Sequence, residues 1–392
     1  MADDVLGRVP VLPMLPFFEE RHGELVASAQ EWVRIGGLGT GTHEDVDGRC
    51  RQLVKVLGEA GWLRYAVPAS HGGHYDQLES RAICLLRQTL AWHDGLADFA
   101  FAMQGLGSGA IALHGTQALK DKYLPKVVSG EWIAAFALSE QDAGSDVAAM
   151  TCSARVDGEH YVIDGSKTWI SNGGIADFYT VVVRTGEAPG AKGLSAFVVD
   201  ADTPGLEIAE RIDVMAPHPL ATLRFNQCRV PASQRLGDPG SGFKVAMQNL
   251  DIFRASVAGA AIGFAQRALA EMIAHVKTRQ MFGQTLADFQ LTQAAIADMA
   301  TQIDSAQLLT YRAAWLRDVK GVRTTREAAM AKMVATEMAQ QVIDRALQAF
   351  GGRGVRSGEV IERLYREIRP LRIYEGATEV QRLIIARDVL AQ

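Results

Sequence analysis

The chain has 392 residues, of which 48% are hydrophobic and 22% charged, a balance typical of a soluble globular protein with two or three domains. Its net charge of -5 and its pI near 6.0 argue against a nucleic-acid-binding protein, although a local basic patch stays open. We find no apolar run long enough to span a bilayer and expect no membrane association.

The N-terminal part of the chain, residues 1–132, is predicted to be helical. Apolar residues recur at helical spacing over 18–33, and a second helix begins at residue 51 and stops at Gly61. A Pro- and Gly-rich loop covers 65–73, and helices resume over 78–112.

The pattern changes to short runs of β-branched and aromatic residues in the middle of the chain, over 133–243. Turn signals such as Asp157-Gly158 and Asn172-Gly-Gly174 separate these runs. We predict an antiparallel β domain whose strands include 154–156, 161–163, 179–183, 196–199 and 221–225.

The C-terminal part, residues 244–392, is again helical in pattern. The candidate helices have the lengths of bundle helices and cover 244–277, 287–318, 325–350 and 379–390. The order α, β, α predicts an α+β multidomain protein with domains at 1–132, 133–243 and 244–392.

The four cysteines lie far apart, without CxxC or metal-type spacing: Cys50, Cys84, Cys152 and Cys228. We interpret them as free buried thiols in a reducing compartment and expect no metal. The first residues lack the basic and apolar regions of a secretory signal, so we expect a cytoplasmic protein.

Two segments of the β region carry chemistry-bearing side chains. Residues 136–146 read Phe-Ala-Leu-Ser-Glu-Gln-Asp-Ala-Gly-Ser-Asp, a loop able to bind a heteroaromatic edge or a phosphate, or else a polar connector. Residues 165–174 place Trp169 beside a Gly-Gly turn. A Trp there can form the wall of a site for a flavin, and the alternative is a core Trp of a barrel.

Two segments of the C-terminal region suit a nucleotide. Arg279-Gln-Met-Phe-Gly-Gln284 sets an Arg and a Phe between helices, fit for a pyrophosphate and an adenine ring, or else an ordinary interhelical turn. The glycines of Gln348-Ala-Phe-Gly-Gly-Arg-Gly354 permit close approach of a dinucleotide, although no strand precedes them as a Rossmann motif requires.

Glu375 lies in the segment Arg372-Ile-Tyr-Glu-Gly-Ala-Thr-Glu-Val-Gln-Arg382. The spacing of Thr378 and Gln381 predicts a capping box and places Glu375 in the turn before a helix. A carboxylate there can face a pocket as a general base, or only complement the helix dipole.

In this order and spacing, the segments resemble the acyl-CoA dehydrogenase family of flavoproteins. The resemblance runs from about 53 to 390 and includes Lys167-Thr-Trp-Ile-Ser-Asn-Gly173, Arg279-x-x-Phe-Gly283, Phe350-Gly-Gly352 and Ile373-Tyr-Glu-Gly376. It implies an α-helical N-terminal domain, a central antiparallel β-barrel and a C-terminal four-helix bundle. It also implies a homotetramer with FAD at a subunit interface.

The resemblance assigns the FAD contacts to two sets of residues. The isoalloxazine and ribityl set, with the loop that follows it, is Phe136, Leu138, Ser139, Gly144, Ser145, Trp169, Ile170 and Ser171. The set facing the FAD of a neighbouring subunit is Arg279, Phe282, Gln290, Gln348, Phe350, Gly351 and Gly352. Thr378 and Glu379 lie by the pyrophosphate turn, where Ala377 replaces a common Thr.

The family dehydrogenates an acyl-CoA thioester to the trans-2-enoyl-CoA and passes the electrons to an electron-transfer flavoprotein. The resemblance makes Glu375 the base for the α-proton and its backbone N–H one of two donors to the thioester carbonyl. Some members carry the base at the position of Phe253, which cannot take a proton here. Arg254 is the expected catalytic neighbour that orients Glu375, and the alternative is a bundle salt bridge.

The substrate contacts implied by the family are Ser145 and Asp251 to pantetheine, Arg254, Tyr374 and Gly376 around the thioester, and Asp98 and Ala102 in the acyl pocket. Asp98 can bind a polar acyl group or face solvent. Small residues at 104–109 suggest a wide or deep pocket. His218 lies in the loop 215–222, which departs from the family pattern. Its side chain either contacts the CoA or acyl part of the substrate or only supports the loop. Short, branched and alicyclic acyl groups all stay open.

Two other functions remain as alternatives. An oxidase or flavin monooxygenase on the same scaffold needs oxygen access to reduced flavin, and the monooxygenase relatives generally lack the Glu found here at Glu375. A non-enzymatic, DNA-associated relative is expected to show a basic patch and an extended C-terminal region, whereas this chain is acidic and ends at Gln392.

Overall fold

The computed structural model describes residues 15–40 and 44–391. It divides into two compact units, each built from separate stretches of the chain. Of the described residues, the helical unit holds 15–37, Glu79–Asp98 and 254–391, and the sheet unit holds those of Leu38–Leu78 together with Phe99–Phe253. The predicted boundaries at 132/133 and 243/244 stay predictions.

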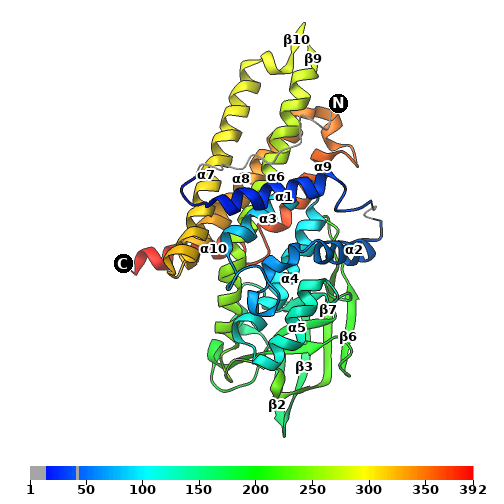
Figure 1. The fold of residues 1–392 in the computed structure, drawn as a ribbon, viewed down its shortest axis with the longest axis vertical. Coiled ribbons are helices and arrows are strands. Elements are labelled where there is room, and N and C mark those ends of the chain that lie inside the picture. Colours follow the sequence, from blue (N-terminus) through cyan, green and yellow to red (C-terminus); the bar gives the residue numbers. More distant parts are fainter. Residues whose placement is uncertain (1–14, 41–43, 392) are drawn as a thin grey trace. The chain divides into compact units, whose positions relative to one another are not determined.

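The sheet unit combines helices with one sheet (Figure 1). Its helices are α2 (Val46–Glu59), most of α4 (Gly95–His114), α5 (Gln117–Ser129) and the start of α6 (Gly242–Thr278). Its strands are β1 (Ala134–Ala137), β2 (Ser153–Asp157), β3 (His160–Ser171), β4 (Phe178–Arg184), β5 (Leu194–Asp200), β6 (Leu206–Arg211), β7 (Leu220–Pro231) and β8 (Arg235–Leu236).

The sheet is open, so the predicted closed barrel is wrong. The strands follow the order β6-β7-β3-β2-β4-β5-β8, with β1 added beside β4. Most strand pairs are antiparallel, as predicted, whereas β1·β4 and β2·β4 are parallel. The edge strand β6 exposes most of its residues, among them Glu207, Glu210 and Arg211, and such charges keep an open edge soluble.

The helical unit contains α1 (Glu20–Arg34), α3 (Ser80–His93), the remainder of α6, α7 (Gln290–Lys320), α8 (Thr325–Phe350), α9 (Val360–Leu371) and α10 (Thr378–Leu390). A short hairpin, β9 (Gln280–Met281) with β10 (Gln284–Thr285), joins α6 to α7 at their far end (Figure 1). Buried residues of α6, α7, α8 and α9 share one apolar core. The four-helix bundle stays a prediction.

Helix α9 was not among the predicted helices, although its sequence carries the signal. Its buried residues Ile361, Leu364, Ile368 and Leu371 recur at spacings of three and four, which define one helical face. Charged residues between them and Pro370 near the end obscure this pattern.

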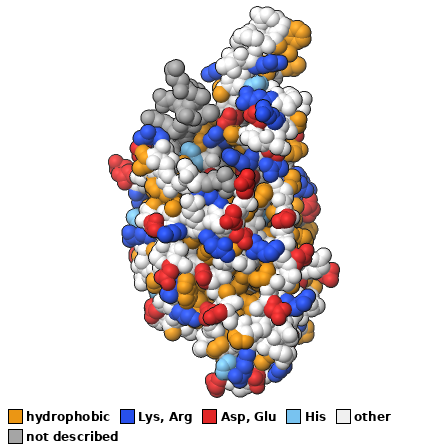
Figure 2. Space-filling model, turned by 90° about the vertical axis from the view of Figure 1, so that its right-hand side faces the viewer, with side chains coloured by type: hydrophobic (Ala, Val, Ile, Leu, Met, Phe, Trp, Pro, Cys, Tyr) orange, Lys and Arg blue, Asp and Glu red, His pale blue; other side chains and the backbone are white. Residues whose placement is uncertain are grey.

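Two helices contradict the expectation that no apolar run could span a membrane. By length and composition α4 and α6 both qualify, yet 83% and 67% of their most apolar windows are buried inside the structure. Burial of this kind is found in core helices of soluble proteins. The four cysteines are free and buried, as predicted. On the face shown in Figure 2, acidic and basic side chains are interspersed.

Candidate active site

Glu375 lies in a left-handed turn between α9 and α10. Its φ is +52° and that of Gly376 is +91°. Left-handed backbone is uncommon for a residue with a side chain, and it persists where the surroundings enforce it, often at functional sites. The turn therefore presents Glu375 in a conformation that its own sequence does not favour.

The predicted capping box at the start of α10 is wrong. The N-cap is Ala377, without a side-chain cap. The Thr378 hydroxyl donates instead to Glu337 Oε1 at 2.6 Å. Gln381 Nε2 donates to the carbonyls of Gly376 at 2.8 Å and Glu375 at 3.3 Å. These two side chains hold the turn in place rather than close the helix end.

Glu375 is half-buried, and one oxygen of its carboxyl, Oε2, is buried and unsatisfied. Among the described residues, Oε2 has no hydrogen-bond partner. Burial raises the pKa of this carboxyl, while Arg87, Lys332 and Arg254 act in the opposite direction and Asp98 adds to the rise. A carboxyl with a buried, free oxygen and a raised pKa suits a group that takes up a proton.

Arg254 lies against the same turn. Its side chain is buried, and Nε donates to the Glu375 carbonyl at 3.3 Å. The structure thus brings together the two residues that the sequence assigned to catalysis, and Arg254 touches the backbone of Glu375. Their catalytic roles stay predictions.

Asp98 is 3% exposed, which contradicts the alternative that it faces solvent. Arg87 donates to both of its oxygens at 2.8 Å, and Arg87 Nη1 donates to Ser256 Oγ at 3.0 Å. Burial raises the pKa of Asp98 and Arg87 opposes it. The pair places a buried cation near Tyr374 and Glu375.

Lys332 is a buried lysine that the sequence analysis missed. It is 0% exposed in α8, and Nζ donates to the Gly376 carbonyl at 2.8 Å. Burial lowers its pKa to about 8, with Glu375 acting in the opposite direction. The available signal was a lysine among mostly small and apolar residues of α8, beside Ala331 and Ala335.

In the sheet unit, the end of β1 lies beside a bulge in β3. The Thr168 N–H donates to the Ser139 carbonyl at 3.0 Å. The buried Lys167 ammonium donates to the Leu138 carbonyl at 3.0 Å and to Glu140 Oε1 at 2.8 Å. These bonds bring together the first predicted flavin segments, 136–139 and 169–171.

Trp169 is 52% exposed, so the alternative of a core Trp is wrong. Its φ is +59°, at the register shift between Lys167 and Ile170. Of the other members of this set, Leu138 and Ile170 are buried, Phe136, Ser139 and Ser171 are half-buried, and Gly144 and Ser145 are exposed.

In the helical unit, the end of α6 meets the end of α8. The His275 ring stacks on Phe350 with ring centres 4.2 Å apart, and the Arg353 guanidinium lies 5.7 Å from the same ring. The pKa of His275 is lowered by burial and by Arg353 and Arg279. This cluster therefore brings Arg279 close to Phe350.

Next to this cluster, the backbone of two glycines is not covered by neighbouring side chains. Gly351 has φ +59°, and a Cβ on it or on Gly352 would meet nothing within 4 Å. Phe282 is 88% exposed at the hairpin, also with positive φ. The remaining predicted residues are exposed (Gln290, Gln348, Glu379), half-buried (Asp251, Tyr374, Gly376) or buried (Ala102, Thr378).

The glycines at 104–109 do not widen a pocket. A Cβ on Gly107 would lie 2.6 Å from the Ala134 methyl, and one on Gly105 would lie 2.6 Å from the Phe253 ring. The space opposite these glycines is filled by neighbouring chain. The suggestion of a wide pocket at this stretch is wrong because close packing, not a cavity, requires the small residues.

His218 belongs to a structured loop. Its Nδ1 donates to the Ala216 carbonyl at 2.8 Å, and its ring lies 4.6 Å from that of Phe99. Burial lowers its pKa. These contacts within the protein explain the position of the His218 side chain, and no contact with a ligand is needed to explain it.

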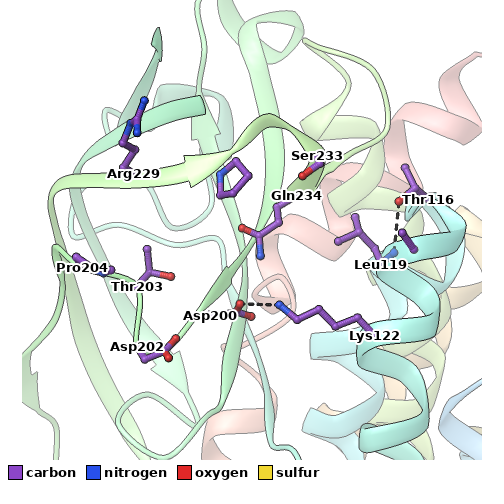
Figure 3. Close-up of a pocket in the computed structure, with 12 residues that line it drawn as sticks. Thr116, Leu119, Lys122, Asp200, Asp202, Thr203, Pro204, Arg229, Ser233 and Gln234 are labelled. Atoms are coloured by element: carbon purple, nitrogen blue, oxygen red, sulfur yellow. Dashed lines mark hydrogen bonds and ion pairs between the residues drawn. The ribbon is translucent and has the colours of Figure 1, made fainter. Parts of the chain in front are cut away.

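A surface pocket of about 650 Å³ opens elsewhere in the sheet unit (Figure 3). It lies between α5 and the β5–β6 connection, and Lys122 reaches across to Asp200 at 2.8 Å. None of the predicted site residues lines it. The predicted chemistry is therefore not in this pocket.

Comparison with known families identifies the class of the fold. Three models match in chain order: the N-terminal domain of acyl-CoA dehydrogenase over residues 22–131, the middle domain over 135–228 and the C-terminal domain over 240–390. The chain therefore belongs to the acyl-CoA dehydrogenase family and is an oxidoreductase acting on CH–CH donors.

Individual relatives cover almost the whole chain. Cyclohexane-1-carbonyl-CoA dehydrogenase of Geobacter metallireducens is 35% identical over 93% of this chain and 95% of its own. A chain in the solved structure of the electron transferring flavoprotein of Acidaminococcus fermentans matches with TM-score 0.89 and 33% identity, over 97% of this chain and 100% of that one. The structure of PigA with FAD and proline matches with TM-score 0.86 and 28% identity, over 96% and 99%.

Proposed function

We propose that this chain dehydrogenates an acyl-CoA thioester to the trans-2-enoyl-CoA, with FAD as cofactor and Glu375 as the base. The Glu375 carboxyl carries the proposal, because its Oε2 lacks a partner among the described residues while its pKa is raised. A carboxylate oxygen without a hydrogen-bond partner can accept a proton.

The residues fit a flavin dinucleotide. In the sheet unit an exposed Trp169 stands on a left-handed bulge beside Ser139 and Ser171, which suits a flat ring with polar edges. In the helical unit Arg279 and the open Gly351-Gly352 turn suit an anionic pyrophosphate. The family's neighbours include complexes with FAD.

The α-proton passes to Glu375 Oε2 in this scheme. The Glu375 N–H, which has no acceptor within the described part of the chain, is free to donate to the thioester carbonyl and stabilise the charge that develops there. Arg254, Lys332 and Gln381 hold the carbonyls of the turn and so fix that N–H. Bound FAD supplies the acceptor for the β-hydride.

The proposal extends to substrate and partners. Ser145 and Asp251 are proposed to contact pantetheine, and Asp98 and Ala102 to flank the acyl pocket. A relative named for a cyclohexane-carbonyl thioester keeps alicyclic acyl groups among the candidates, with short and branched ones. We further propose a cytoplasmic homotetramer that passes electrons to an electron-transfer flavoprotein.

The test is anaerobic titration of the FAD-loaded protein with a panel of short, branched and alicyclic acyl-CoAs while flavin absorbance is followed. Wild type is expected to bleach with at least one of them. Glu375→Gln is expected to keep its FAD and lose bleaching by a factor of about 1,000 or more, since both oxygens of the other carboxyl that acts on this site, Asp98, are bonded to Arg87. The exposed Glu24→Gln serves as control. Near wild-type bleaching by Glu375→Gln would reject the base assignment.

A further inference from the structure

The hydrogen bond of Lys332 to the turn explains where its side chain lies, but it does not explain why a charged group is buried there. Its ammonium, with no exposed surface, donates to the Gly376 carbonyl at 2.8 Å. Gln381 donates to that same carbonyl at 2.8 Å with a neutral amide. The two lone pairs of the carbonyl can accept both bonds, but a second neutral donor would serve there equally well, whereas a buried ammonium is costly to desolvate. The hydrogen bond to Gly376 therefore does not explain why the donor is charged, and the charge must act on another group.

The geometry points to the Glu375 carboxyl, because the Lys332 ammonium is bonded to the carbonyl of Gly376, the residue that follows Glu375 in the turn. Among the groups that act on Lys332, Glu375 has the largest electrostatic effect. Conversely, Lys332 stands among the cations that act on Glu375, after Arg87 and before Arg254. Arg87 is bonded twice to Asp98, so part of its charge is already balanced.

We propose that Lys332 is a positioning residue for the base: its buried ammonium fixes the Glu375-Gly376 turn and favours the ionised form of the Glu375 carboxyl. This inference rests on the proposed role of Glu375. It adds to that role a reason why this carboxyl is ionised, and so ready to accept a proton, near neutral pH. The lysine keeps its own charge there, since its pKa is about 8.

Other charged groups face the pair, and their variation would confuse the test. Around Glu375 they are Arg87, Asp98, Arg254 and the neighbouring Tyr374, and around Lys332 they are Arg254, Glu337 and Glu379. All of these stay unchanged in the variants below, so that only the charge of one side chain differs.

The experiment is the rate of anaerobic flavin bleaching by a saturating acyl-CoA, measured in stopped flow between pH 5 and 9 with FAD-loaded protein. Lys332→Met removes a positive charge near the carboxyl, so the carboxyl is protonated at higher pH. The acid limb, which is the fall of the bleaching rate at low pH as Glu375 becomes protonated, is expected to move up by about one pH unit. Removal of a nearby opposite charge shifts a carboxyl pKa by about 1–3 units, so this is the lower end of the range. Lys332→Arg keeps the charge and is expected to keep the limb of wild type.

A structural role alone would lower the rate at every pH without moving the limb, and that result overturns the inference. The exposed Lys55→Met is the matched control. If Lys332→Met fails to fold, Lys332→Gln, which can still donate to Gly376, replaces it with the same expected shift. Bleaching of wild type and its loss in Glu375→Gln test the proposed function separately, so an unshifted limb beside those two results rejects only the role of Lys332.

Discussion

The Phe253 ring packs so closely on Gly105 that a Cβ at that glycine would lie 2.6 Å from Phe253 Cε1. The ring is 1% exposed and also faces Gly109. Phe253, which the resemblance to the family matched with an alternative position of the base, is here a packing residue set against the glycines of α4. This arrangement explains both the apolar side chain and the small residues opposite it.

Gly105→Ala tests this packing. The new methyl must displace a buried ring, and overpacking of this kind costs about 1–3 kcal/mol of stability. The control is Gly23→Ala in α1, whose Cβ would meet nothing within 4 Å and which is expected to gain about 1 kcal/mol from helix propensity. The measurement is the thermal midpoint of the FAD-loaded protein. Equal midpoints for the two variants would contradict the packing described here.

Asp98→Asn tests the buried ion pair beneath the turn. Removing this negative charge leaves Arg87 buried without its ionic partner, at a cost of about 3 kcal/mol. Asp98 raises the pKa of Glu375 and Arg87 lowers it, so the change lowers that pKa. The acid limb of flavin bleaching should therefore move to lower pH, opposite to the shift expected for Lys332→Met. If the acid limbs of Asp98→Asn and Lys332→Met moved in the same direction, this electrostatic account would be refuted.

The sequence predicted the α, β, α order and most long helices, because periodic apolar patterns and turn residues act locally. It did not predict the open sheet, since the parallel contacts of β4 with β1 and β2 join residues far apart in the chain. Likewise Thr378 and Gln381 have capping-box spacing, but the Thr378 hydroxyl bonds to Glu337, which lies far away in the chain, and Gln381 bonds to the Gly376 carbonyl of the preceding turn.

The candidate site shows the same limit. The order of the motifs singled out Glu375, Arg254 and the segments predicted to bind the flavin, whereas it did not point to Lys332 or Arg87. Each of these two is a charged residue in an apolar helix face, and only the packing of other elements around it decides whether it is buried and what it meets.

Trp169→Ala separates cofactor binding from folding. The side chain is half-exposed, so its loss should leave the thermal midpoint of the protein without cofactor nearly unchanged. Loss of a stacking surface is expected to weaken FAD binding about tenfold, near 1.4 kcal/mol. Fluorescence titration with FAD measures this. The exposed Val156→Ala in β2 is the control, and unchanged affinity in Trp169→Ala would remove this Trp from the flavin site.

Because burial lowers the pKa of Lys332, the stability of the protein is expected to depend on pH. Its native pKa of about 8 lies below the value of ~10.4 for an exposed lysine, so the unfolded chain binds more protons between these two pH values. Burial of the charged form therefore costs about 3 kcal/mol below pH 8, and this cost is relieved as pH rises from 8 towards 10.

The Lys332→Met variant escapes this cost. It should be at least as stable as wild type at pH 7, and wild type should gain on it between pH 8 and 10. Thermal midpoints of both FAD-loaded proteins at pH 7 and 9.5 give the comparison, with Lys55→Met again as the control for an exposed lysine. A constant difference between wild type and Lys332→Met at both pH values would mean that the lysine is not held in a costly charged state. A variant that is more stable and yet bleaches only at higher pH would instead show that this lysine is kept for its action on Glu375 and not for the fold.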